Sequence, residues 1–110
     1  MVTHPLRLAA LLARSIRGPR VSPIRAAGDR LLRGPATADE IAEATALWEA
    51  VAAHRDPVGT MLGLLRVLCE EQPRGIGLDR AVTQCAARDG HDVRESAGRA
   101  LLDAHTRGAA

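Results

Sequence analysis

Residues 37–70, TADEIAEATALWEAVAAHRDPVGTMLGLLRVLCE, contain two successive helical patterns that together predict an all-α fold. Thr37 is suited to the N-cap of a helix, and Glu40 three residues later completes a capping box. Apolar residues then recur every three or four positions, which is the narrow stripe of a coiled-coil seam. We therefore expect a stalk-like, coiled-coil-like helix over residues 38–54. Its stripe consists of Ile41, Ala44, Trp48 and Val51.

The Asp56-Pro57 pair, in the middle of this stretch, has two interpretations. Pro at the first helical position after an Asp N-cap begins a new helix. Pro inside a continuing helix kinks it. In either case an apolar stripe resumes at Val58, and this helix is expected to end near Glu70, before Gln72-Pro73.

Two shorter helical patterns follow toward the C-terminus. The first is expected over residues 78–88 and ends at Gly90, which suits the left-handed position after a helix. Asp92 is expected to cap the last helix, because Glu95 three residues later repeats the capping-box spacing. The helices after Pro57 predict a small three-helix bundle. Stalk and bundle together would form one unit over residues 37–110.

The first 36 residues are different in kind. Gly and Pro residues interrupt the chain repeatedly between Gly18 and Pro35, which excludes a long helix there. Residues 4–17 are consistent with a short basic amphipathic helix, and residues 18–36 are expected to be a linker. We therefore predict a basic, poorly ordered leader and linker over residues 1–36.

Charge is divided unevenly along the 110 residues, a length that allows one domain at most or a smaller domain with a tail. All fifteen cations are Arg. Residues 1–34 contain seven of them and one acid, Asp29, for a net charge of +6, whereas residues 35–110 have a net charge of −4. A basic arm attracts nucleic acid or an anionic membrane surface. The alternative is a solvated leader that binds nothing.

Composition and the scatter of reactive side chains argue against a β fold and against an enzyme. Trp48 is the only aromatic residue, and abundant Ala, Leu, Arg and Glu favour helices. A catalytic site needs a nucleophile with a base, paired carboxylates or a metal cluster, whereas the histidines are scattered along the chain and no Gly-rich phosphate loop is present. The histidines show no metal-type pairing either, so we predict a non-enzyme without metal or cofactor. They are His4, His54, His91 and His105.

The sequence also suggests a compartment. No stretch approaches the roughly 18 uncharged apolar residues of a membrane span. The apolar run near the start is bracketed by Arg7 and Arg14, and no convincing signal cleavage site follows it. Cys69 and Cys85 form neither a disulfide framework nor a closely spaced metal pair. We expect two buried free thiols in a cytoplasmic protein with no membrane partner.

Three blocks within residues 47–104 resemble the ANTAR domain, the RNA-binding module of bacterial antitermination regulators. In that family a Leu/Ala-rich helix with an Arg leads into an Ile-x-x-Ala-x-Gly-x-Leu stretch, and LWEAVAAHRDPVGTMLGLL (residues 47–65) is similar to it. LDRAVTQCAA (78–87) and HDVRESAGRALLDA (91–104) resemble the next two blocks. The matching residues are Leu47, Ala50, Val51, Arg55, Val58, Gly63, Leu65, Asp79, Ala81, Val82, Cys85, Val93, Arg94, Glu95 and Ala97.

The sequence also departs from the family pattern. Pro57 interrupts what is usually a continuous helix, Met61 replaces a small Ala, and Val82 replaces an aromatic residue. The loop of residues 73–77 is longer than usual. In the family's basic turn only His91 and Arg94 are cationic here.

The resemblance implies an RNA-binding transcription regulator of antitermination type that forms a homodimer through the stalk and presents its three-helix unit to RNA hairpin loops. Arg suits that task, since its planar guanidinium binds phosphate and stacks on unpaired bases. The RNA-binding positions that the resemblance implies are Arg55, Arg88, His91, Arg94 and Arg99. The stripe Ile41, Ala44, Trp48 and Val51 would form the dimer seam, or it packs within the monomer.

A second function class stays open. The acidic body and the weakened basic turn favour a non-catalytic helical module for protein interaction or dimerisation, without RNA binding. In the ANTAR family a sensory domain often shares the chain. No such domain is evident here, so a sensory partner protein is expected to supply any input.

Overall fold

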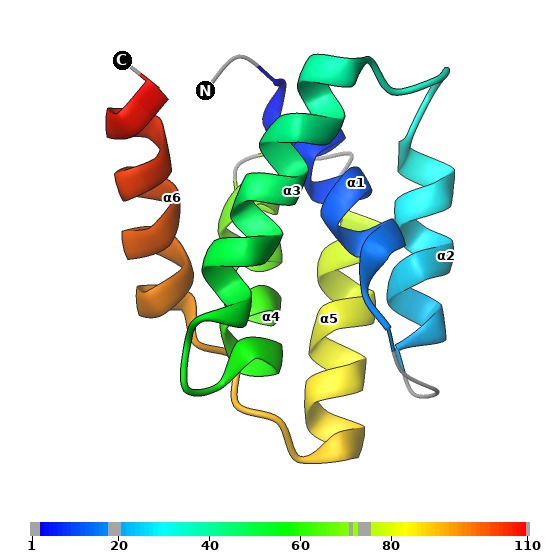
Figure 1. The fold of residues 1–110 in the computed structure, drawn as a ribbon. Helices are drawn as coiled ribbons and strands as arrows, with labels where there is room; N and C mark the ends of the chain where they lie inside the picture. The colour runs from blue at the N-terminus through cyan, green and yellow to red at the C-terminus, as the bar shows by residue number, and fades with distance from the viewer. Residues whose placement is uncertain (1–2, 18–20, 71, 73–75, 110) are drawn as a thin grey trace.

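The computed structural model describes residues 3–17, 21–70, 72 and 76–109, and within these residues the secondary structure is helical throughout (Figure 1). The predicted all-α class is therefore confirmed. The described helices are α1 (Pro5–Ser15), α2 (Ser22–Leu31), α3 (Ala38–Ala52), α4 (Pro57–Cys69), α5 (Ile76–Asp89) and α6 (Glu95–Ala109).

The first helix lies inside the fold, not beside it. Six consecutive residues of α1, Leu8–Ala13, are buried. The helix packs against α2, α3 and α4 (Figure 1). A helix that is apolar on all sides is stable only when neighbours cover all of them. The prediction of a poorly ordered leader is thus wrong for the described part of residues 1–36, because Leu and Ala residues of this part belong to the core.

The interruptions that suggested a linker have other roles. Pro23 falls in the first turn of α2, where its missing N–H costs nothing. Gly28 marks the crossing of α2 over α1, since a Cβ there would lie 2.9 Å from the carbonyl oxygen of Ala10. Gly34 has a φ of +77° and turns the chain toward α3. Gly18, Pro19 and Arg20 lie outside the described residues.

The third helix begins as predicted but does not project as a stalk. Thr37 and Glu40 form the complete capping box. The helix then lies against α1, α4 and α6. The Cα radius of gyration is 12.6 Å, close to the roughly 13 Å of a compact domain of this length. The stripe resembles a coiled-coil seam in its spacing alone. The fully buried Leu47, which lies between its members, widens the stripe into a core face.

The fourth helix is a separate element that begins at Pro57. This confirms the first interpretation of Asp56-Pro57, in which Asp56 caps a new helix. The Asp56 carboxylate accepts a hydrogen bond from the Gly59 N–H at 3.0 Å, and Pro57 is the first helical residue. α4 contacts α1 as well as α5 and α6. The C-terminal helices therefore share one core with α1 and α2 and do not form a bundle of their own.

The last helix begins two residues later than predicted. Gly90 has the expected left-handed φ of +69°, but Asp92 does not cap α6, which starts at Glu95. The segment before Glu95 is held in a non-helical path along α4, where the Arg94 N–H donates to the Gly59 carbonyl at 3.0 Å. A Cβ on Gly63 would collide with the Arg94 carbonyl, so the close path requires glycine there.

Both cysteines are buried free thiols, as predicted. Burial raises the pKa of Cys69 to about 12, with a smaller contribution from Asp79. None of the described helices combines the length and the apolar character that crossing a membrane requires.

Candidate functional site

Four of the five residues expected to bind RNA lie at one end of the molecule (Figure 1). Arg55 is exposed in the turn before α4, His91 and Arg94 are exposed in the segment before α6, and Arg88 is in the last turn of α5. Arg99 lies elsewhere, in the second turn of α6. The structure thus brings four of them to one end but does not form a single patch from all five.

Carboxylates bind several of these cations. The Arg94 Nε donates to Asp56 Oδ2 at 3.0 Å, and Arg99 donates to Glu70 at 2.7 Å. The Gly59 N–H and then Arg94 lower the pKa of Asp56, so this carboxylate stays ionised and caps α4. Arg88 lies 3.7 Å from Asp89. Arg55 makes no hydrogen bond or ion pair with another described residue, and it and His91 are exposed. The side chains of Arg88 and Arg94 are also more than half exposed, although each lies beside a carboxylate.

The stripe predicted to form a dimer seam is divided by the fold. Ala44 and Val51 are buried, and Trp48 is half-buried against the same core. Ile41 is 52% exposed. Packing within the monomer therefore accounts for most of the stripe, and only Ile41 projects to the surface.

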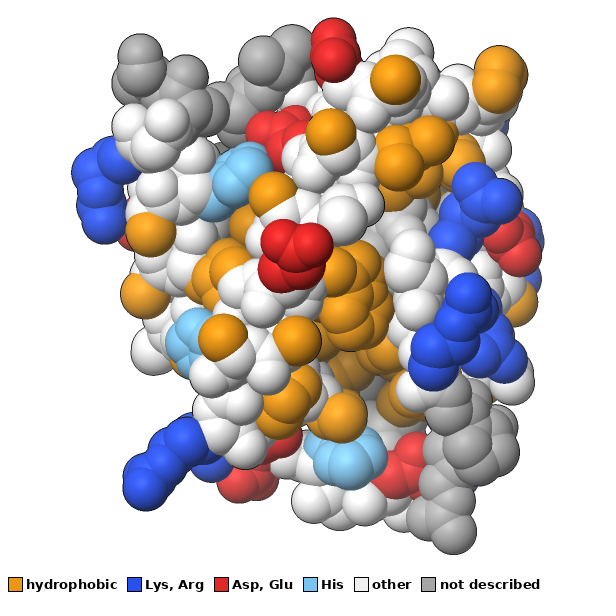
Figure 2. Space-filling model, viewed as in Figure 1, with side chains coloured by type: hydrophobic (Ala, Val, Ile, Leu, Met, Phe, Trp, Pro, Cys, Tyr) orange, Lys and Arg blue, Asp and Glu red, His pale blue; other side chains and the backbone are white. Residues whose placement is uncertain are grey.

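The outward face of α3 is poor in charge. We call this face, made of exposed residues, the α3 outer face, and Figure 2 shows apolar side chains along it. Asp39 and Glu49 are its two carboxylates, and the remaining residues are small or apolar. A contiguous exposed apolar surface is often a contact surface for another protein. The uncharged residues of the α3 outer face are Ile41, Ala42, Thr45, Ala46, Ala50, Ala52 and Ala53.

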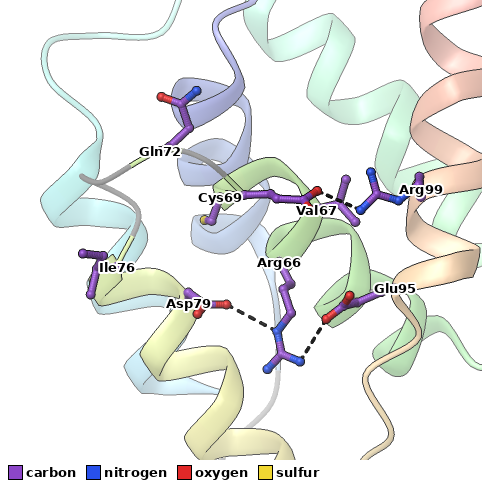
Figure 3. A pocket seen from close by; sticks show the side chains of 9 residues that line it. Arg66, Val67, Cys69, Gln72, Ile76, Asp79, Glu95 and Arg99 are labelled. Carbon is purple, nitrogen blue, oxygen red and sulfur yellow. Dashed lines mark hydrogen bonds and ion pairs between the residues drawn. The ribbon is translucent and has the colours of Figure 1, made fainter.

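A cavity of about 360 Å³ opens where α4, α5 and α6 meet (Figure 3). Its main feature is Arg66, which donates to Asp79 at 3.3 Å and to Glu95 at 3.1 Å. The same guanidinium donates to the Thr83 hydroxyl at 2.6 Å. Cys69 also lines the cavity, but its raised pKa keeps it a thiol at neutral pH, and the thiolate is the reactive form.

The Arg66 cluster joins three helices and has no free cation to offer a ligand. Each acidic partner comes from a different helix, so the cluster fixes how α5 and α6 sit on α4 (Figure 3). Sequence reasoning missed it. The available signal was that Arg66 is the sole charged residue within the apolar run of α4.

Five arginines on α1, on α2 and just after each helix form a more accessible cationic surface. Figure 2 shows cationic side chains gathered over these two helices at the right of the view. Arg14 pairs with Asp29 at 2.8 Å, and the Arg25 guanidinium donates to the Ile16 carbonyl at 3.3 Å. Arg17, Arg30 and Arg33 make no hydrogen bond through their side chains with another described residue. We call the five residues Arg14, Arg17, Arg25, Arg30 and Arg33 the arginine surface.

A groove of about 530 Å³ lies at one end of the arginine surface, where α1 begins and α2 ends. Beside it, Arg7 binds Glu40 through two hydrogen bonds of 2.5 and 2.9 Å. Arg7 also donates to the carbonyl of Arg33 at 2.7 Å, which pins the chain after α2 to α1. The Arg7 hydrogen bond lowers the pKa of Glu40 to about 2. The groove is lined by His4, Leu6, Arg7, Arg30, Leu31 and Arg33.

One described histidine, His105, pairs with an acid, but this pair is not part of a metal centre. Within the described residues no group of three potential ligands is close enough to hold a metal ion. His105 of α6 lies 2.9 Å from Glu43 of α3. The Thr3 N–H also donates to Glu43, at 3.1 Å.

No protein-family model, no curated protein and no solved structure shows a significant match to this chain.

Proposed function

We propose that this protein is an RNA-binding regulator that contacts RNA phosphates through the arginine surface of α1 and α2. One observation carries the proposal. Arg14 and Arg30 lie on α1 and α2, and Arg17 and Arg33 lie just after the ends of these helices; all four are exposed, and Asp29 is the one acid of residues 1–34.

A folded cationic surface supports binding better than a loose arm does. Its arginines are already held apart at fixed positions, so less conformational entropy is lost when phosphates are bound. Arg also stacks on unpaired bases, which the loops of RNA hairpins expose. Because residues 35–110 carry a net charge of −4, an RNA strand is drawn toward α1 and α2 and away from the rest of the surface.

The end of the molecule that carries Arg55 and His91 supplies the second part of the proposal. Arg55 and His91 are exposed and lie where the ANTAR resemblance implies RNA contact. In this proposal they add to the affinity that the arginine surface provides. Antitermination is the regulatory role that the resemblance implies.

The proposal is tested by fluorescence anisotropy with a labelled RNA hairpin at several salt concentrations. Each phosphate contact contributes about −0.7 to −0.9 to the slope of log affinity against log salt. The double variant Arg14→Gln/Arg17→Gln is expected to reduce this slope by between one and two. The control Arg80→Gln/Arg107→Gln removes the same charge from exposed positions on α5 and α6 and is expected to change it little.

The other outcomes are equally informative. If Arg55→Gln/Arg94→Gln weakens binding and the α1 variant does not, the RNA surface is the one that the resemblance implies. If both pairs and the control weaken binding equally, only net charge matters. Absence of binding at low salt by the full chain would overturn the function itself.

A second candidate function rests on the α3 outer face. Its small and apolar side chains suit a protein interaction module, with a second copy of the chain or a sensory protein as partner. Ala46→Arg, at the middle of this face, is expected to abolish an association that sedimentation detects at micromolar concentration. Ala87→Arg, on the exposed side of α5, is the matched control. A wild-type protein that sediments as a monomer excludes the homodimer.

A further inference from the structure

The groove between the start of α1 and the end of α2 has the features of a binding site for a small anion. Its volume of about 530 Å³ lies within the roughly 300–1,000 Å³ that is usual for small-ligand sites. Three arginines and a histidine line it, and no acid does: His4, Arg7, Arg30 and Arg33. Glu40 lines the neighbouring cavity, which shares His4 and Arg7 with the groove.

Two of these cations are available to a ligand. Arg7 is occupied by Glu40 and by the carbonyls of Arg33 and Pro35. Arg30 and Arg33 are exposed and make no side-chain hydrogen bond or ion pair with another described residue. Two unpaired guanidinium groups three positions apart provide the planar, forked donors that phosphate oxygens accept.

The backbone around these arginines is held in place. Arg7 donates to the Arg33 carbonyl at 2.7 Å and to the Pro35 carbonyl at 3.3 Å. Gly34 between them has a φ of +77°, which a residue with a side chain rarely adopts. The position of Arg33 relative to Arg30 is therefore fixed by α1, and Arg7 acts as a positioning residue.

The remaining walls indicate what else the ligand carries. Leu6 and Leu31 are half-buried at the groove and offer an apolar contact. His4 Nδ1 accepts a hydrogen bond from the Leu6 N–H at 3.1 Å. The imidazole proton of neutral His4 therefore lies on Nε2, where it is free to be donated.

We infer that this groove binds a phosphate monoester whose organic part is small and partly apolar, such as a nucleoside monophosphate. Arg30 and Arg33 bind the phosphate, and Leu6 and Leu31 contact the organic part. The same chemistry has two sources, a free small molecule and the 5′-phosphate end of an RNA strand. The inference goes beyond the proposed function and does not require it, because a free phosphate monoester is sufficient.

The test is calorimetric titration of the full chain with adenosine monophosphate, adenosine and inorganic phosphate. We expect the monophosphate to bind with a dissociation constant below one millimolar, inorganic phosphate to bind more weakly and adenosine not to bind. Charge-assisted hydrogen bonds of this kind contribute about tenfold each to affinity. Arg30→Gln/Arg33→Gln should therefore reduce the affinity for the monophosphate by about a hundredfold. Arg80→Gln/Arg107→Gln is the matched control and should bind normally.

Other outcomes separate this inference from the RNA proposal. Equal weakening by the control, or adenosine binding as tightly as its monophosphate, would overturn the phosphate site, as would no binding by the wild type. Arg14→Gln/Arg17→Gln changes residues outside the groove, so it should weaken RNA binding and leave binding of the monophosphate unaffected. Short RNA strands with and without a 5′-phosphate distinguish the two sources of the phosphate. Tighter binding of the phosphorylated strand identifies the RNA end as the ligand, and equal binding of both strands identifies the free small molecule.

Discussion

Gly98 of α6 lies so close to Gly63 of α4 that a Cβ on Gly98 would stand 2.7 Å from the Gly63 carbonyl carbon. The two backbones therefore touch without intervening side chains. The segment before α6 also passes directly over Gly59 and Gly63, which explains why it is not helical. Glycines on α4 thus decide where α6 can begin and how closely it packs.

Gly98→Ala should therefore destabilise the protein. The added methyl meets backbone atoms, which cannot move aside as a flexible side chain can, and overpacking of this kind costs about 1–3 kcal/mol. Gly108→Ala is the matched control, because nothing lies near a Cβ at that position of the same helix. In a helix that change is expected to gain roughly 0.5–1 kcal/mol. Urea unfolding of both variants measures the difference, and a stabilising Gly98→Ala would refute the close packing.

The Arg7–Glu40 pair should make the free energy of unfolding depend on pH in the acidic range. The Arg7 hydrogen bond, with help from Thr37, lowers the pKa of Glu40 to about 2, from 4.5 without these partners. A carboxylate whose folded pKa is lowered stabilises the fold above its unfolded pKa, and this contribution is lost as the pH falls from about 4.5 toward 2. Glu40→Gln should reduce that part of the pH dependence. Glu49→Gln, which changes an exposed carboxylate of the same helix, should retain that pH dependence. Urea unfolding of both variants at pH 7 and pH 3 measures the difference.

The His105–Glu43 contact should hold the C-terminal half of α6. Burial raises the pKa of Glu43, but hydrogen bonds from Thr3 and His105 outweigh it, so the pKa is lowered overall. His105→Ala leaves this half-buried carboxylate with Thr3 alone, at a cost of about 1 kcal/mol. Hydrogen exchange should then accelerate in α6 more than in α4. His54→Ala, in the exposed turn after α3, should leave exchange in α6 unchanged.

Local signals in the sequence were reliable, and signals that depend on distant partners were not. The capping box at Thr37 and the left-handed Gly90 depend on a few neighbouring residues, so their spacing was sufficient. At Asp56-Pro57 the sequence left a new helix and a kink both open, and the fold shows a new helix. Asp92 had the same spacing as a cap, but Gly59 and Gly63 of α4 hold that segment in another path. No local pattern contains that information.

The candidate site was harder to predict for the same reason. The sequence indicated the excess of arginine before residue 35 and a short basic helix over residues 4–17, but it gave no sign that this helix is buried in the core or that a second helix packs against it. Arg94 meets Asp56 across 38 positions, and Arg7 meets Glu40 across 33. Which cations are paired and which are accessible depends on these contacts. The accessible ones became identifiable only in the folded chain.

Removing residues 1–36 should abolish cooperative folding. α1 contributes six consecutive buried residues and contacts both α3 and α4, so its removal exposes part of the core that these helices share. That core includes Leu47 and Leu64, both fully buried in the whole chain. Residues 37–110 alone are expected to lose the cooperative thermal transition in circular dichroism and to expose Trp48 to quenchers. Adding a peptide of residues 3–36 should restore part of the helical signal, because it refills the same space. A cooperative transition of residues 37–110 by themselves would show that α1 and α2 pack on a body that is already complete.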